Sequence, residues 1–163
     1  MPGPFVNQWL DACGFARGAL GFTPDPVQAA ILRSTSRRIL LNCCRQWGKS
    51  TVTAALIAHR LVHGGPSTLI LAVAPALRQS GELLRKVARF LALCGLPTRG
   101  DGDNALSLLL PNGARVVGLP GGDATIRGFS AVSLLVLDEA ARVSDETYFA
   151  LRPTLATNPN AAL

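Results

Sequence analysis

Residues 38–63 read RILLNCCRQWGKSTVTAALIAHRLVH, an apolar run that leads through a polar turn into apolar residues at helical spacing. The run from Arg38 to Cys44 predicts a short buried strand, and Ser50 to His63 predicts a helix that the following glycines end. Where a strand passes into a helix, backbone N–H groups and the positive end of the helix dipole converge on one point. We therefore expect the turn from Arg45 to Gly48 to face a phosphate group.

The residue types at this junction fit phosphate binding. Gly48 lets the backbone approach a phosphate, Lys49 reaches the β- and γ-phosphates of a nucleotide, and the Ser50 hydroxyl can bind Mg²⁺. The common form of the loop, GxxxxGK[ST], would have glycine at position 43, where this chain has Cys43. A plain turn between strand and helix would also explain a glycine, but the flanking elements favour a phosphate loop.

The rest of the chain alternates between strand and helix patterns. Further strands are expected at residues 68–74, 105–110, 114–119 and 132–137, with a hairpin turn at residues 111–113. Further helices are expected at residues 5–15, 27–34, 77–93 and 144–156. This alternation predicts an α/β fold with a mainly parallel sheet flanked by helices.

Two carboxylates, Asp138 and Glu139, directly follow the apolar run at residues 132–137. Ligands of a parallel sheet gather at the carboxyl ends of its strands, so both should lie at the same edge as Lys49. Nucleotide hydrolysis needs one acid to hold Mg²⁺ and a second to take a proton from the attacking water. Asp138 suits the first role and Glu139 the second. Capping of the next helix is the alternative for this pair, but its agreement with the phosphate loop favours catalysis.

Composition and charge add little about the partner. The net charge of +6 is compatible with nucleic acid, although arginines spread over helix surfaces explain it more simply. The spacing of Cys13, Cys43, Cys44 and Cys94 does not suit zinc, and reduced thiols are the simplest account. Cys43 and Cys44 lie in the strand expected before the loop, where a thiol behaves as a small buried hydrophobic group. The apolar runs are too short to cross a bilayer and no export signal opens the chain, so we expect no membrane and a place in the cytoplasm.

In these residues the chain resembles the large terminase subunits of tailed phages, in their ATPase domain. The stretch from Arg45 to Ser50 is similar to the family's altered phosphate loop, R-Q-x-G-K-[ST], which lacks the leading glycine. The run from Leu134 to Ala140 is similar to its Walker B motif, with Glu139 as the catalytic glutamate. Three further segments resemble the family, so that the likeness covers about residues 22–163: Phe22 to Leu32, Val73 to Glu82, and Ile126 to Ser130.

The resemblance implies a P-loop NTPase fold of the RecA-like (ASCE) class, with a lead-in at residues 1–22 and an ATPase domain at residues 23–163. Asn158 to Asn160 would turn into the family's next strand at Ala161 to Leu163, so we expect a domain that is C-terminally incomplete and without the family's nuclease domain. Nuclease activity is not expected of this chain.

The resemblance also implies Mg²⁺-dependent ATP hydrolysis, with Mg²⁺ held by Ser50 and Asp138. The expected ATP contacts are Gln28, Arg45, Gln46, Trp47, Gly48, Lys49, Ser50 and Thr51. Arg45 would be an arginine finger within its own subunit, unless it only ties the loop backbone, and Trp47 favours packing over base stacking. Arg127 would be a finger offered to a neighbouring subunit, with an ordinary surface arginine as the alternative. A guanidinium on the γ-phosphate is worth roughly 10³ to 10⁵ in rate.

The partners that the family implies are duplex DNA, a small terminase subunit, a portal protein and further copies of the chain in a ring, all in the bacterial host cytoplasm. Such a motor would power the movement of a genome into procapsids. Two other interpretations stay open. Residues 138–141 also fit the DEAx box of a superfamily 2 helicase fragment, and the chain could be a catalytically silent nucleotide-binding remnant. The presence of Lys49, Ser50, Asp138 and Glu139 favours hydrolysis.

Overall fold

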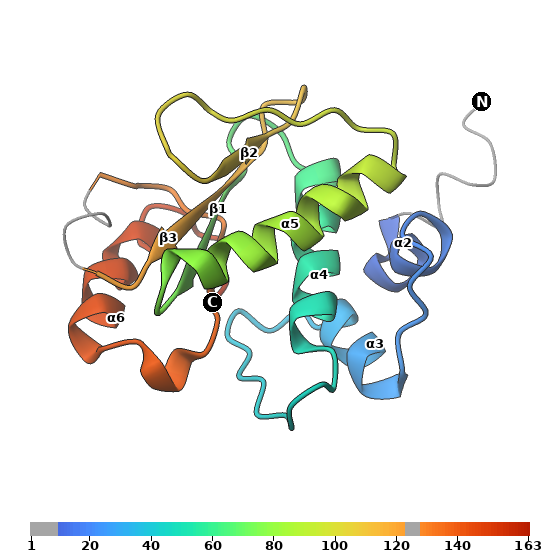
Figure 1. Ribbon diagram of the computed structural model, residues 1–163, viewed down its shortest axis with the longest axis horizontal. Helices are drawn as coiled ribbons and strands as arrows, with labels where there is room; N and C mark the ends of the chain where they lie inside the picture. Colours follow the sequence, from blue (N-terminus) through green and yellow to red (C-terminus); the bar gives the residue numbers. More distant parts are fainter. Residues whose placement is uncertain (1–9, 123–127) are drawn as a thin grey trace.

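Four strands form one sheet in the order β2-β3-β1-β4 (Figure 1). They are β1 (Leu69–Ala74), β2 (Ser107–Leu109), β3 (Arg115–Pro120) and β4 (Leu134–Leu137). β1 pairs in parallel with β3 and with β4, whereas the short β2 runs antiparallel beside β3. This arrangement comes from a computed structural model that describes residues 10–122 and 128–163. The predicted α/β fold with a mainly parallel sheet is confirmed.

Helices cover both faces of this sheet (Figure 1). The α-helices are α2 (Ala12–Gly18), α3 (Pro26–Arg33), α4 (Lys49–His63), α5 (Leu77–Leu93) and α6 (Asp145–Leu151), and the 3₁₀ helices are η2 (Ala140–Arg142) and η3 (Arg152–Leu155). Successive side chains of β1 point to opposite faces. Ile70 and Ala72 pack in a core cluster with α2 to α5, whereas Leu71 and Val73 pack with Leu151 of α6. No helix in the described part of the chain is long and apolar enough to cross a membrane.

Apart from the helix at residues 5–15, the predicted helices and the hairpin are confirmed with small changes at their ends. Asp25 caps α3 and Pro26 begins it, one residue before the predicted start. Ser144 caps α6 by accepting a hydrogen bond from the Thr147 N–H at 3.2 Å. The predicted helix at residues 144–156 changes to 3₁₀ geometry at Arg152, because Pro153 has no N–H to donate to the preceding turn.

The segment at residues 38–44 differs from the prediction of a buried strand. It is extended and largely exposed, and Leu40 is 86% exposed. Its backbone pairs with Leu163 through two hydrogen bonds: the Ile39 N–H donates to Leu163 at 2.9 Å, and the Leu163 N–H donates to Arg37 at 2.8 Å. A buried parallel strand needs neighbours on both sides and cover on both faces. In the described residues this segment has a neighbour on one side, so its apolar side chains stay exposed.

The cysteines before the loop are therefore not buried hydrophobic residues, and that prediction was wrong. Cys43 is half-buried and Cys44 is exposed, and both are free thiols. The predicted helix at residues 5–15 is confirmed only in part. α2 begins at Ala12, where Asp11 caps it, and continues to Gly18, while the predicted start lies outside the described residues.

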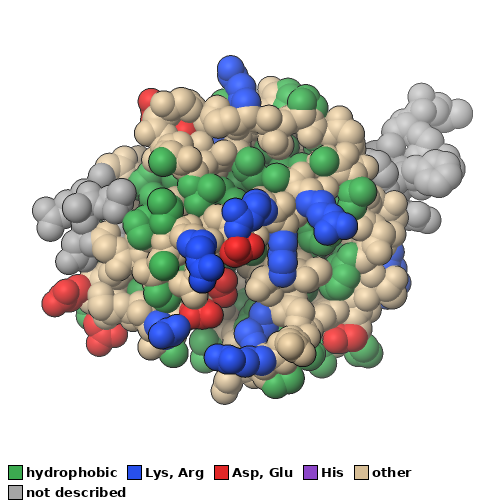
Figure 2. Space-filling model, viewed as in Figure 1, with side chains coloured by type: hydrophobic (Ala, Val, Ile, Leu, Met, Phe, Trp, Pro, Cys, Tyr) green, Lys and Arg blue, Asp and Glu red, His purple; other side chains and the backbone are tan. Residues whose placement is uncertain are grey.

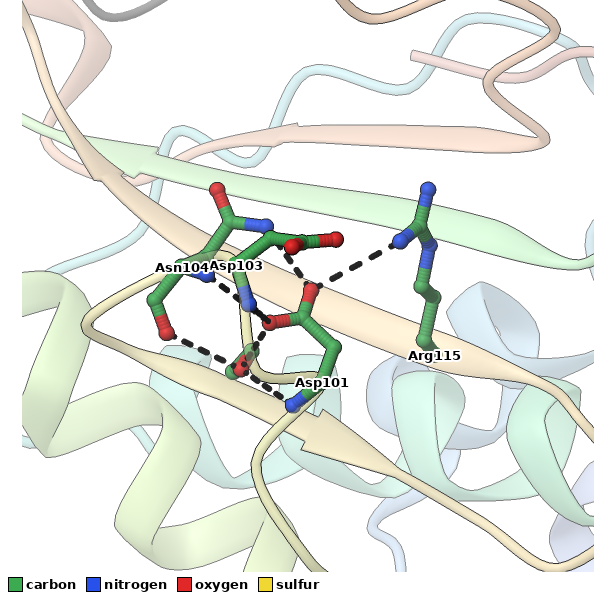
Figure 3. Close-up of polar contacts among 5 residues, drawn as sticks. Asp101, Asp103, Asn104 and Arg115 are labelled. Atoms are coloured by element: carbon green, nitrogen blue, oxygen red, sulfur yellow. Dashed lines mark hydrogen bonds and ion pairs between the residues drawn. The ribbon is translucent and has the colours of Figure 1, made fainter.

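The connection between α5 and β2 is organised by one carboxylate, Asp101, whose side chain is only 2% exposed (Figure 3). Its Oδ1 accepts hydrogen bonds from the backbone N–H groups of Asp103 and Asn104 at 3.1 and 2.9 Å and from the Ser107 hydroxyl at 2.8 Å. Its Oδ2 accepts from the Asn104 amide at 2.8 Å and lies 3.7 Å from the Arg115 guanidinium. Burial alone raises the pKa of Asp101, but these hydrogen bonds outweigh it and lower that pKa.

Candidate nucleotide-binding site

Parallel backbone pairing brings the predicted phosphate loop and the acidic strand end to one edge. β4 pairs with β1 on one side, and on the other Ala162 forms a parallel bridge with Leu134. Leu163 in turn pairs with residues 37–39, in the hydrogen-bond pattern of parallel strands. The segment that enters the loop therefore runs in the same direction as β4. The carboxyl ends of both point to the edge where ligands of parallel sheets bind.

The loop itself is held by its own lysine. The Lys49 Nζ donates to the backbone carbonyl of Cys43 at 2.8 Å and to that of Cys44 at 2.7 Å. Gln46 and Gly48 both have left-handed backbone conformations, with φ of 61° and 97°. Such a conformation is uncommon for a residue with a side chain, and it indicates a loop whose shape is imposed by its surroundings. α4 begins at Lys49, so its first N–H groups lie at the loop.

Gln28 of α3 binds the backbone of the loop. Its side chain is buried; the Oε1 accepts from the Asp25 N–H at 3.0 Å, and the Nε2 donates to the Trp47 carbonyl at 3.1 Å. A Cβ on Gly48 would lie 3.0 Å from that Nε2, a tight contact, and the φ of 97° also favours glycine. Trp47 is half-buried and packs against the core, as expected of a packing residue. Gln28, predicted to contact ATP, is thus placed to position the loop.

The acidic strand end continues β4. The Asp138 N–H donates to the Val73 carbonyl of β1 at 2.8 Å, and the Asp138 Oδ1 accepts from the Glu139 N–H at 3.1 Å. Glu139 has a left-handed backbone (φ 50°), which turns its side chain out of the strand. Its Oε2 accepts from the Gln79 Nε2 at 3.0 Å and lies 3.5 Å from the Arg142 guanidinium.

Solved structures of phage large terminases have a similar fold. The ATPase domain of the large terminase of Thermus phage P74-26 matches over 88% of this chain with a TM-score of 0.72 and 26% sequence identity. A variant of the same domain matches over 91%, with a TM-score of 0.75 and 25% identity. The large terminase of bacteriophage HK97 matches over 94%, with a TM-score of 0.78 and 18% identity, and at that identity it supports the fold alone.

The chain fits a phage large terminase ATPase domain. It spans 64% and 66% of the two P74-26 chains and 36% of the HK97 chain. The sequence matches no protein-family model and has no significant match to a curated protein. The terminase resemblance of the sequence is confirmed, and it is favoured over the helicase-fragment alternative.

Within this terminase ATPase fold, the described site residues fall into three groups. Lys49, Asp138 and Glu139 lie at the ends of elements that share one sheet edge, and Ser50 and Thr51 lie half-buried in the first turn of α4. Arg45 and Gln46 are exposed on the loop. Arg127 lies outside the described residues, so its role as a finger stays a prediction.

Gln79, which contacts the predicted catalytic glutamate, was not predicted from the sequence. Gln79 lies in the first turn of α5, where its Oε1 also accepts from the Ala76 N–H at 3.1 Å. The sequence signal for this second contact is a glutamine three residues after a helix start, which is a capping position. No sequence signal links Gln79 to Glu139, because the pair is 60 residues apart and meets only through the β1–β4 pairing.

Proposed function

We propose that this chain binds ATP at residues 43–51 and hydrolyses it, as the ATPase domain of a large terminase that drives duplex DNA into a viral procapsid. The observation that carries the proposal is the shared sheet edge of the loop before α4 and of Asp138 and Glu139 after β4. That edge is where parallel α/β sheets bind their ligands. Solved structures that share this fold include large terminases and a terminase ATPase domain.

Lys49 provides the main charge for binding. Its ammonium lies against the Cys43 and Cys44 carbonyls, which keeps a positive charge at the loop. On binding, this ammonium would exchange two neutral carbonyls for the charged oxygens of the β- and γ-phosphates, a stronger interaction. The first N–H groups of α4 and its dipole add to the attraction.

The oxygen ligands fit a magnesium ion. The Ser50 hydroxyl and the Asp138 carboxylate are the hard oxygen donors that Mg²⁺ prefers. Asp138 is half-buried, and no hydrogen bond among the described residues occupies its Oδ2. When bound, Mg²⁺ would neutralise charge on the phosphates.

Glu139 would act as the general base. A proton passes from the attacking water to its carboxylate, the oxygen attacks the γ-phosphorus, and the bridging oxygen leaves with ADP. Arg45 would stabilise the growing negative charge within the subunit, and Arg127 would do so from a neighbouring copy. The proposal includes the partners of this activity: further copies of the chain in a ring, a small terminase subunit, a portal protein and duplex DNA.

The experiment is a measurement of Mg-ATP binding and of phosphate release with Lys49→Ala. Loss of the ammonium should weaken binding at least about tenfold, since charge-assisted contacts are worth about 1.5–3 kcal/mol. The matched control is Arg17→Ala, which removes one positive charge from the exposed end of α2. Equal binding by folded Lys49→Ala and Arg17→Ala would rule out the assignment of the loop.

A catalytically silent nucleotide-binding domain is the second candidate. The observation that favours it is that the Glu139 carboxylate already has two partners, Gln79 and Arg142. Mg-ATP binding without phosphate release by the parent chain, at any protein concentration and with DNA present, would identify this second function.

A further inference from the structure

The outer face of α5 carries a stripe of basic side chains. Arg78, Arg85 and Arg89 follow one another at intervals of seven and four residues, so they lie on one side of the helix. Lys86 flanks the stripe, and Glu82 is its single acidic member. Figure 2 shows blue side chains gathered around a red one over α5. We call these five residues the α5 stripe.

The helix beneath this stripe is fixed to the core. Its inner face buries Leu83, Leu84, Val87 and Leu91. Phe90, the one aromatic residue of α5, packs against the same core. The stripe is therefore a rigid, convex row of charges with no aromatic platform for unstacked bases and no apolar face to enter a membrane.

Most of the positive charge on the stripe is not neutralised within the protein. Glu82 pairs with Arg85, a surface ion pair of small value. In the part of the chain that the structure describes, Arg78, Lys86 and Arg89 have no hydrogen bond or ion pair. The stripe carries a net charge of +3, which is half of the chain's formal net charge of +6.

We infer that the α5 stripe binds the phosphate backbone of duplex DNA. This inference rests on the proposed function, which supplies duplex DNA as the partner. From Arg78 to Arg89 the helix rises by about 16 Å, and a duplex carries about one charge per 1.7 Å of axis. Each guanidinium can thus face a separate phosphate, and guanidinium binds phosphate through two parallel hydrogen bonds. Contacts to phosphate alone are independent of base sequence, as DNA movement requires.

The test compares the binding of a labelled random-sequence DNA duplex by the full chain and by its variants, from low to moderate salt. The triple variant Arg78→Ala, Arg85→Ala, Arg89→Ala should bind at least about tenfold more weakly at roughly 100 mM salt, and its plot of log K against log salt should be shallower by about 2 to 3. The matched control has the same loss of charge outside α5: Arg17→Ala, Arg38→Ala, Arg152→Ala. This control should change DNA binding less than about threefold.

Glu82→Gln gives a gain that misfolding cannot produce. Removing the one negative charge of the stripe should tighten DNA binding several-fold. Parental affinity in the stripe triple variant, or an equal loss in the control triple variant, would overturn the inference. Tighter binding of duplex RNA or single-stranded DNA than of duplex DNA would overturn the assignment to duplex DNA.

ATP hydrolysis without DNA is measured on the same proteins and separates the two proposals. If neither the parent nor any variant hydrolyses ATP while the stripe triple variant loses DNA affinity, the proposed ATPase function fails and the DNA-binding surface stands. If the parent hydrolyses ATP and the stripe triple variant keeps the parental DNA affinity, the inference about the surface fails and the ATPase function stands.

Discussion

At the scale of single residues, hydrogen bonds within the protein hold the shape of the loop. Lys49 holds two carbonyls of its own loop, and Gln28 holds a third from the neighbouring helix. Under the proposed function, a loop held in this shape before ATP arrives would lower the conformational entropy that binding must overcome. This arrangement makes Gln28 a positioning residue for the phosphate loop.

Gln28→Ala tests that role. The change leaves the Trp47 carbonyl without its donor and removes the acceptor of the Asp25 N–H, so we expect a loss of about 1–3 kcal/mol in the free energy of unfolding. Mg-ATP binding should weaken as the loop loosens. Gln28→Glu keeps the cap acceptor but places a carboxylate against the Trp47 carbonyl. It should therefore lose ATP affinity and at least as much stability, because the carboxylate is a buried, unpaired charge; calorimetry and urea unfolding measure the two effects. Parental ATP binding by both variants would contradict the role.

At the scale of elements, Asp101 fixes the path from α5 to β2. Its pKa is lowered, so the carboxylate stabilises the fold at neutral pH, and this contribution is lost as the pH falls through that lowered pKa, below about pH 4. Asp101→Asn should lower the free energy of unfolding by about 1–3 kcal/mol at pH 7. Asp103→Asn, an exposed neighbour, is the matched control and should change it by less than about 0.5 kcal/mol.

The difference between parent and Asp101→Asn should narrow as the pH falls, because the parent carboxylate is then protonated. Urea unfolding at a series of pH values measures this. A difference that stays constant down to about pH 2, or equal stability of Asp101→Asn and Asp103→Asn at pH 7, would show that the carboxylate charge is not what orders this connection.

The same scale shows what the sequence could predict. α3, α4, α5 and β1 were predicted to within a residue or two, because caps, glycines and apolar periodicity are local signals. The exposure of residues 38–44 was not predictable, since it depends on long-range packing: among the described residues the segment pairs on one side only, with Leu163. The α5 stripe was missed because its arginines are scattered in the sequence and are gathered only by the helical turn.

At the scale of the whole molecule, the sheet is what unites the two halves of the site. The loop and the Asp138–Glu139 pair lie about 90 residues apart in the sequence. The parallel pairing of β4 with Ala162, and of Leu163 with residues 37–39, brings them to one edge. That shared edge was predictable from the rule for parallel sheets. The contact of Gln79 with Glu139 was not, because it depends on the side-chain geometry where α5 and η2 approach.

The central claim is that the phosphate loop and Glu139 form one ATP-hydrolysing site, and Glu139→Gln tests it most directly. Phosphate release and Mg-ATP binding are measured for the parent and the variant at high protein concentration, so that a neighbouring copy can supply Arg127. The amide keeps the shape of the side chain but cannot take a proton, so binding should stay within about threefold of the parent while release falls by about 10² to 10⁴. A parent that releases phosphate no faster than Glu139→Gln would contradict the claim.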